Sequence, residues 1–256
     1  MTRPLPPLAL ALHQTPARTK GAPLAVGARS LRAILGRLLD RGYRFLRVEE
    51  VEPGGLPLGY ALLTVDDGYA SNRDVLAPLA RELGIPWGVF VLVGAPGGRN
   101  DWDLRGVSPR ERHLREEEIR GLAGEGVSIG SHGMTHRDFT RLNDAELAAE
   151  LADSKAWLER TTGRRVDALS YPWGRVNRRV AEAARAAGYR RCFGLRGPGD
   201  FCIARTALYS PDQIPGVFEA TALLAPRAGR VLRDSAGALG GWLVARALAA
   251  LGRAHA

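Results

Sequence analysis

The chain has 256 residues, of which 45% are hydrophobic and 25% charged, proportions that exclude wholesale disorder and fit a soluble globular protein. This length suffices for one α/β barrel or for two small domains, and we favour one main domain. The 36 Lys and Arg residues outnumber the 27 Asp and Glu residues, but the arginines are scattered and form no basic arm with interleaved aromatic residues, which argues against a nucleic-acid partner.

Short apolar runs alternate with helical patterns along the chain, as in strand and helix units around a parallel sheet. Several of the helical patterns end in a glycine directly before the next apolar run, which fits a helix C-cap that turns back into the sheet. This regularity indicates a barrel or a doubly wound sheet. We expect strands over 8–13, 43–48, 60–65, 86–93, 127–131, 168–172, 189–195 and 204–209, and helices over 29–41, 71–83, 115–124, 143–161 and 177–187.

The N-terminal segment, MTRPLPPLALALHQ, contains an arginine and a short apolar run that ends in His13. Prolines interrupt it and no small-residue cleavage site follows, so we expect no signal peptide. No apolar run approaches the ~20 residues that span a bilayer. These features predict a cytoplasmic protein. His13 by itself is a weak functional signal.

Two adjacent carboxylates, Asp66 and Asp67, follow the expected strand over 60–65 and precede a glycine. In isolation, Asp-Gly is a common turn signal. Successive side chains on a strand point to opposite faces, however, so one of the two would face the core and would need a partner there.

The loop over 94–112 is rich in Gly, Pro, Arg and Asp, and it is long enough to be functional. Trp102 in this loop is a candidate for a sugar subsite, although we favour a solvated loop with one packed aromatic residue. We expect His113, just after the loop, to lie on the surface.

Two histidines, His132 and His136, follow the expected strand over 127–131 at a spacing that lets neutral imidazoles converge on one cation. Such pairs also arise by chance. Their position at the end of a strand matters, because parallel sheets and barrels assemble their sites at that edge. Two histidines and one carboxylate form the ligand set of a hydrolytic metal centre with open positions.

The stretch ALSYPWGRVN places Tyr171, Pro172 and Trp173 at another strand end, either as part of the site or as a strand-ending turn with packed aromatic residues. Cys192 and Cys202 are too few for a disulfide-stabilised scaffold, so both are expected to be free thiols. We divide the chain into a barrel over 1–210 and a helical tail over 211–256.

In this order and with these separations, the segments TVDDG at 64–68, SHGMTH at 131–136 and YPWG at 171–174 resemble the polysaccharide deacetylases of the NodB-homology type, carbohydrate esterase family 4. The resemblance covers residues 5–210. It implies a distorted (β/α)7 barrel of the NodB type. It also implies that Asp66 is the catalytic base, and that Asp67, His132 and His136 bind a divalent metal, usually zinc.

The chain departs from the family pattern in two places. Ser170 stands where the third motif usually has an arginine that orients the base, and the late Leu-x-His motif that supplies the general acid is missing. The segment LALALHQ, however, resembles the opening strand of the poly-N-acetylglucosamine deacetylases, a subgroup in which the acid histidine lies near the N-terminus. This resemblance assigns the acid role to His13 and implies substrate contacts for Tyr171, Pro172, Trp173 and Trp102.

The expected function is removal of N-acetyl groups from amino sugars of a glycan or of a lipid-linked saccharide. Two alternatives stay open: a metal-independent amidohydrolase of the allantoinase or cyclic-imidase type, and an inactive glycan-binding barrel. The amphipathic pattern of the tail over 211–256 is compatible with a helix packed on the barrel or with peripheral contact at the inner membrane face.

Overall fold

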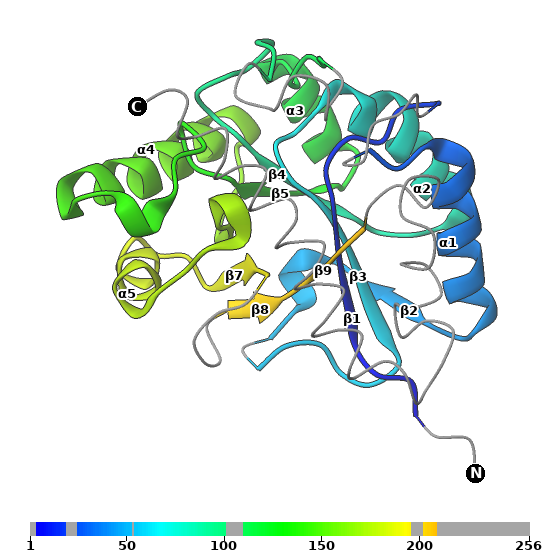
Figure 1. Ribbon diagram of the computed structural model, residues 1–256. Coiled ribbons are helices and arrows are strands. Elements are labelled where there is room, and N and C mark those ends of the chain that lie inside the picture. The colour runs from blue at the N-terminus through cyan, green and yellow to red at the C-terminus, as the bar shows by residue number, and fades with distance from the viewer. Residues whose placement is uncertain (1–3, 19–24, 53, 101–109, 196–201, 209–256) are drawn as a thin grey trace, which may run out of the picture.

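The computed structural model describes residues 4–18, 25–52, 54–100, 110–195 and 202–208, and every structural statement below concerns these residues. Trp102 and the tail over 211–256 lie outside them. Parallel strands form one sheet that curls into a nearly closed barrel, with the helices on its outside (Figure 1). This architecture confirms the expected distorted barrel and decides against an open, doubly wound sheet.

The strands lie where the sequence predicts them, with shorter bounds. Their order in the sheet is β8-β7-β6-β5-β4-β3-β1-β9, and β2 pairs with the beginning of β3. All of these pairings are parallel. The strands are β1 (Leu8–Leu12), β2 (Arg44–Leu46), β3 (Tyr60–Val65), β4 (Gly88–Val91), β5 (Ser128–Ser131), β6 (Ala168–Ser170), β7 (Arg191–Gly194), β8 (Cys202–Ala204) and β9 (Thr206–Ala207).

One short segment closes the barrel. The expected strand over 204–209 is two strands, β8 and β9, with only Arg205 between them. β8 pairs with β7 and β9 pairs with β1, so this segment joins the two edges of the sheet. Cys192 and Cys202 face each other across β7 and β8, and both are free and buried, as expected.

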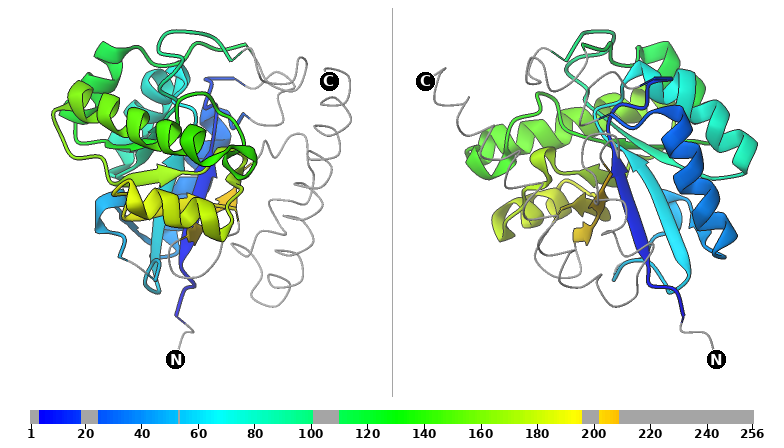
Figure 2. Two further views of the ribbon diagram at one scale, coloured as in Figure 1. Left: turned by 90° about the vertical axis from the view of Figure 1, so that its left-hand side faces the viewer. Right: turned by 45° about the vertical axis from the view of Figure 1, so that its right-hand side comes forward.

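Five α-helices cover the barrel, and each presents an apolar face to it. In the two views of Figure 2, one group of helices lies against β1 and β3, and another lies on the side of β6 and β7. α4 begins with a capping box between Asn143 and Glu146 and ends at Gly163, which has a left-handed conformation. The helices are α1 (Ala28–Asp40), α2 (Ala77–Leu83), α3 (Glu116–Gly124), α4 (Asp144–Thr162) and α5 (Arg178–Ala186).

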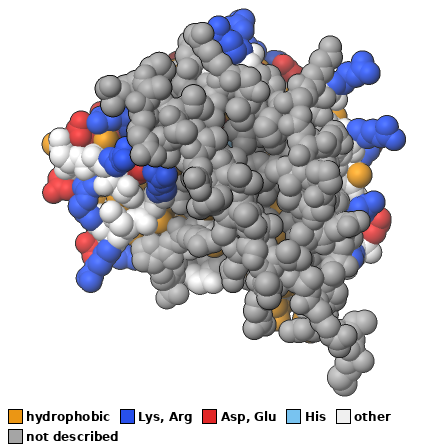
Figure 3. Space-filling model, in the orientation of Figure 1, with side chains coloured by type: hydrophobic (Ala, Val, Ile, Leu, Met, Phe, Trp, Pro, Cys, Tyr) orange, Lys and Arg blue, Asp and Glu red, His pale blue; other side chains and the backbone are white. Residues whose placement is uncertain are grey.

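Charged side chains lie on the outside of this shell. On the face shown in Figure 3, the Lys and Arg side chains of the described residues are scattered along the outline and are interspersed with acidic ones. Within the described part of the chain, no helix is both long enough and apolar enough to cross a membrane.

The barrel interior is tightly packed at Gly130 on β5. A Cβ atom added there would lie 2.4 Å from the Phe90 ring, so we expect Gly130→Ala to lower the free energy of unfolding by about 1–3 kcal/mol through overpacking. Gly121→Ala is the control, because Gly121 lies in α3 with no atom within 4 Å of the added Cβ, and helix propensity should make it neutral or stabilising. Urea denaturation measures both. Equal effects of the two substitutions would contradict the packing argument.

Candidate active site

Polar side chains gather at the carboxyl edge of the barrel. β1 ends directly before His13, and β3 ends directly before Asp66 and Asp67. The parallel register pairs Leu12 with Val65, so His13 and Asp66 leave neighbouring strands at the same level. β5 and β6 lead to the other two segments that the sequence singles out.

Asp67, His132 and His136 converge on one point, with one ligand atom of each lying within 4.8 Å of the others. Oδ1 of Asp67 lies 3.3 Å from Nε2 of His132 and 3.4 Å from Nε2 of His136. Their side chains are at most 9% exposed. Burial lowers the pKa of His132 to about 3, although the charge of Asp66 acts in the opposite direction. His132 is therefore neutral at physiological pH, which is the form that binds a metal. This donor set fits a divalent transition-metal ion.

A left-handed backbone turns Asp67 toward the metal-ligand set. Asp67 has φ 68°, and the next residue, Gly68, has φ 70°. Aspartate tolerates this conformation better than most residues. Because the backbone of Asp67 is no longer extended, its side chain does not follow the alternating directions of the side chains on β3. The backbone carbonyl of Asp67 accepts a hydrogen bond from Nδ1 of His113 at 2.9 Å. His113 is buried and stacks on Tyr69, so its expected surface position is wrong.

The two histidines are oriented by groups on β6 and on the turn that follows it. Nδ1 of His132 donates to the carbonyl of Ser170 at 2.8 Å, which leaves Nε2 as the ligand atom. The His136 ring packs against Trp173 in a tilted arrangement, with 4.8 Å between ring centroids and 46° between the ring planes. Nε1 of Trp173 donates to the His136 carbonyl at 2.9 Å. The third sequence segment thus supports both histidine ligands.

Asp66 is held by a buried arginine. Nη1 and Nη2 of Arg205 contact Oδ1 and Oδ2 of Asp66 at 2.9 and 2.7 Å, and the side chains are only 2% and 7% exposed. Burial alone would raise the pKa of Asp66. The charge of Arg205 and its hydrogen bonds to the carboxylate act in the opposite direction, and the pKa lies well below its usual range. Asp66 is therefore an ionised carboxylate in a set position.

Sequence reasoning missed Arg205. The arginine expected two residues before Pro172 is absent, as the sequence shows, but the base does have a guanidinium partner, which comes from the segment that closes the barrel. Nη2 of Arg205 also donates to Oγ of Ser170 at 2.7 Å. The serine at position 170 therefore binds the guanidinium of Arg205, where the family pattern has an arginine at that position itself. The only signal in the sequence is an arginine inside the apolar run CIARTAL at 202–208.

His13 directly follows β1, the strand that pairs with β3, so its backbone lies at the same level as that of Asp66. The backbone N–H of Asp66 donates to the Leu12 carbonyl at 2.9 Å. Nδ1 of His13 is buried and has no hydrogen-bond partner among the described residues. Its role as general acid stays a prediction.

The expected substrate-contacting residues differ in exposure. Tyr171 is fully buried in the cluster beneath the site, and Pro172 is buried as well. The Trp173 side chain is the one large exposed group of this turn, at 38%. Of these three residues, Trp173 presents the surface that a sugar ring can contact.

The buried pair of Asp66 and Arg205 leads to a stability test. Arg205→Ala should lower the free energy of unfolding by about 3–5 kcal/mol, because it leaves the Asp66 carboxylate buried without its partner. In the double variant with Asp66→Asn, the loss should be smaller than the sum of the single losses by about 1–3 kcal/mol. Arg178→Ala is the control, since its pair with Glu182 is exposed and should contribute less than about 1 kcal/mol. Urea denaturation of the four variants measures these losses in the free energy of unfolding. Additive losses in the double variant would contradict an energetic coupling between Asp66 and Arg205.

Known proteins resemble this chain in sequence and in fold. The family model for polysaccharide deacetylase matches residues 56–192, more than half of the chain. YxkH of Bacillus subtilis (strain 168), assigned as a polysaccharide deacetylase, is 28% identical over 180 residues, which are 67% of this chain and 59% of that protein. The chain therefore spans only about three fifths of this relative.

Two solved structures share the fold. IcaB from Ammonifex degensii has a TM-score of 0.69 at 22% identity and covers 88% of this chain and 97% of its own. The Streptococcus pyogenes deacetylase PplD, solved with acetate, has a TM-score of 0.64 at 19% identity and covers 83% of this chain and 97% of its own. The family model matches more than half of the chain, and the barrel fold agrees with it. The chain therefore belongs to the polysaccharide deacetylase family.

Proposed function

We propose that this protein hydrolyses the amide bond of N-acetylated, or similarly N-acylated, amino sugars in a glycan or glycoconjugate, with the help of a divalent metal, which we take to be zinc. One observation carries the proposal. An ionised carboxylate, Asp66, lies directly beside three converging metal-ligand side chains at the carboxyl edge of the barrel. Family membership supports the same reaction.

Asp67, His132 and His136 would hold the metal. Two imidazoles and a carboxylate are a common ligand set of hydrolytic zinc sites, which keep open positions for water and substrate. When bound in such a set, the ion lowers the pKa of water from 15.7 to about 7 and polarises a carbonyl group.

Asp66 would act as general base. Its lowered pKa keeps it ionised, and a carboxylate oxygen that accepts one bond from Arg205 retains a lone pair for the proton of the attacking water. The two-point contact with Arg205 holds this carboxylate in one orientation, which matters because proton transfer depends on geometry.

His13 would act as general acid and protonate the leaving amine. It directly follows β1, at the level of Asp66 after the neighbouring strand β3, and its Nδ1 has no hydrogen-bond partner among the described residues. Transfer of a proton to the amine allows the carbon–nitrogen bond to break. The products are acetate and a free amino sugar.

The substrate would meet the site at Trp173. Its ring is partly exposed and packs against the His136 ring, so a sugar ring packed on it would lie beside the metal ligands. A lipid-linked saccharide at the inner membrane face is the form of substrate that suits a cytoplasmic deacetylase with an amphipathic tail. This part of the proposal rests on the sequence alone.

The two alternative functions are less well supported. A metal-independent amidohydrolase has no need for three buried, converging ligand side chains. In an inactive barrel the base would lack its arginine partner, whereas here Arg205 contacts Asp66. Both observations favour a metal-dependent enzyme.

The first functional prediction separates the base from the metal ligands. Asp67→Ala and His132→Ala should each lose the bound metal, because each removes a ligand. Asp66→Asn should keep the metal and lose turnover, because it removes only the base. Metal content by mass spectrometry and acetate release from N-acetylated saccharides measure the two effects. Complete metal loss in Asp66→Asn would show that these roles are misassigned.

The second functional prediction tests His13. His13→Ala should lower kcat by ~10²–10⁴ and leave metal content unchanged, because it removes the acid and no ligand. The loss should shrink on an activated anilide substrate, whose leaving group needs less protonation. An equal loss on both substrates would contradict an acid role for His13.

A further inference from the structure

The turn between the two histidine ligands has an unusual backbone. His132 follows β5 directly, but His136 lies four residues later, beyond Gly133, Met134 and Thr135. Gly133 has φ 81° and His136 has φ 59°. The position of His136 therefore depends on a turn that includes a residue in a costly conformation. Such a conformation persists only where the surroundings hold it.

A buried carboxylate from α4 contacts this turn. Oε2 of Glu150 accepts hydrogen bonds from the backbone N–H of Met134 at 2.6 Å and of Thr135 at 3.2 Å, and Oε1 accepts one from the Thr135 hydroxyl. Glu150 is only 5% exposed. Among the described residues it has no ion pair, so the turn supplies the donors for its carboxylate. Buried carboxylates are rare unless such partners satisfy them.

The opposite side of the turn rests on the end of β4. Val93 N–H donates to the Gly133 carbonyl at 3.0 Å, and Gly94 N–H donates to the Met134 carbonyl at 2.8 Å. A Cβ atom on Gly94 would lie 2.1 Å from that carbonyl oxygen. The turn therefore lies between the backbone after β4 and the Glu150 carboxylate, with no space to move toward β4.

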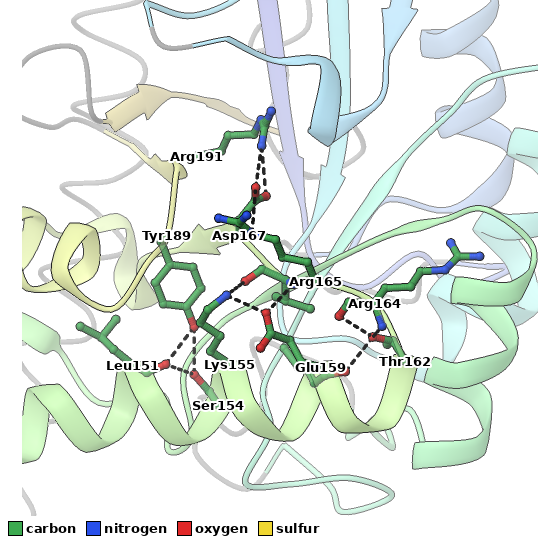
Figure 4. A network of polar contacts seen from close by, with 12 residues as sticks. Leu151, Ser154, Lys155, Glu159, Thr162, Arg164, Arg165, Asp167, Tyr189 and Arg191 are labelled. Carbon is green, nitrogen blue, oxygen red and sulfur yellow. Dashed lines mark hydrogen bonds and ion pairs between the residues drawn. The ribbon is translucent and has the colours of Figure 1, made fainter.

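The helix that carries Glu150 is itself tied to the barrel. Oγ of Ser131, at the end of β5, donates to Oγ of Ser154, and Ser154 donates to the Glu150 carbonyl at 2.6 Å. Figure 4 shows the neighbouring contacts of α4, in which the Tyr189 hydroxyl donates to the Leu151 carbonyl and Lys155 contacts Glu159. Because the hydroxyls of Ser131 and Tyr189 tie α4 to β5 and to the segment before β7, Glu150 is a rigid support for the turn.

We propose that Glu150 is a positioning residue for the metal centre, which acts by holding the turn over 133–135 so that His136 faces Asp67 and His132. The inference rests on the proposed function, because it takes these three residues to be metal ligands. Neither the ligand motif nor its spacing points to Glu150, which lies 14 residues after His136 on a helix. Its contribution to metal binding is the support it gives through hydrogen bonds to the turn.

The test measures metal affinity of the full chain. Glu150→Gln keeps the size of the side chain but replaces one acceptor oxygen by an amide nitrogen that cannot accept. We expect its zinc affinity, from competition with a chromophoric chelator, to fall by about 10–100-fold, and the absorption spectrum of bound cobalt to change. Thr135→Val should weaken zinc binding in the same direction, and Thr135→Ser should restore it. The Thr135 pair gives the answer if Glu150→Gln does not fold.

Glu159→Gln is the matched control. Glu159 lies on the same helix and contacts Lys155 and the Val166 N–H, so its loss affects stability without touching the turn. We expect the Glu159→Gln variant to have the zinc affinity and the cobalt absorption spectrum of the wild-type chain. Wild-type behaviour of Glu150→Gln, or an equal loss in Glu159→Gln, would overturn the inference. If the wild-type chain binds no zinc, the metal centre itself is wrong. If it binds zinc as predicted but releases no acetate, the inference stands and the proposed function fails.

Discussion

The buried pair of Asp66 and Arg205 connects the closure of the barrel to its chemistry. Arg205 lies between β8 and β9, the segment that joins the two sheet edges, and its guanidinium contacts both oxygens of the candidate base. A pair buried this deeply is stable only when both members are present, because either charge alone would lack a partner. The last strands of the barrel are therefore also part of the candidate active site.

Backbone strain is concentrated at the same edge. Among the described residues, the non-glycine positions with positive φ are Asp67, His136 and Trp173, and all three belong to the candidate site. Such conformations cost energy and persist where neighbouring groups determine them. His113 contacts the Asp67 carbonyl, Trp173 contacts the His136 carbonyl, and Glu150 supports the turn before His136. The ligand positions thus depend on residues outside the ligand motif.

Arg205 also shows how a site can keep a contact while its sequence motif changes. Ser170 stands where the family pattern has arginine, and its hydroxyl accepts a hydrogen bond from the arginine that comes from elsewhere. The contact between guanidinium and carboxylate depends on where the two groups lie in space, and the chain can supply the guanidinium from more than one element. A missing motif residue is therefore weak support for lost catalysis.

The sequence alone determined the strand and helix order and the three segments at the carboxyl edge, because these depend on local periodicity and on short motifs. Periodicity left a barrel and a doubly wound sheet open, and the expectation of a barrel came from the family resemblance. It could not identify Arg205, which is 139 residues from Asp66, or Glu150 and the buried His113. Their roles arise from contacts that only the closed barrel creates, and no local pattern encodes a contact between distant elements. The exposure of Trp173 and the burial of Tyr171 were likewise decided by tertiary packing, since both residues belong to one short aromatic turn.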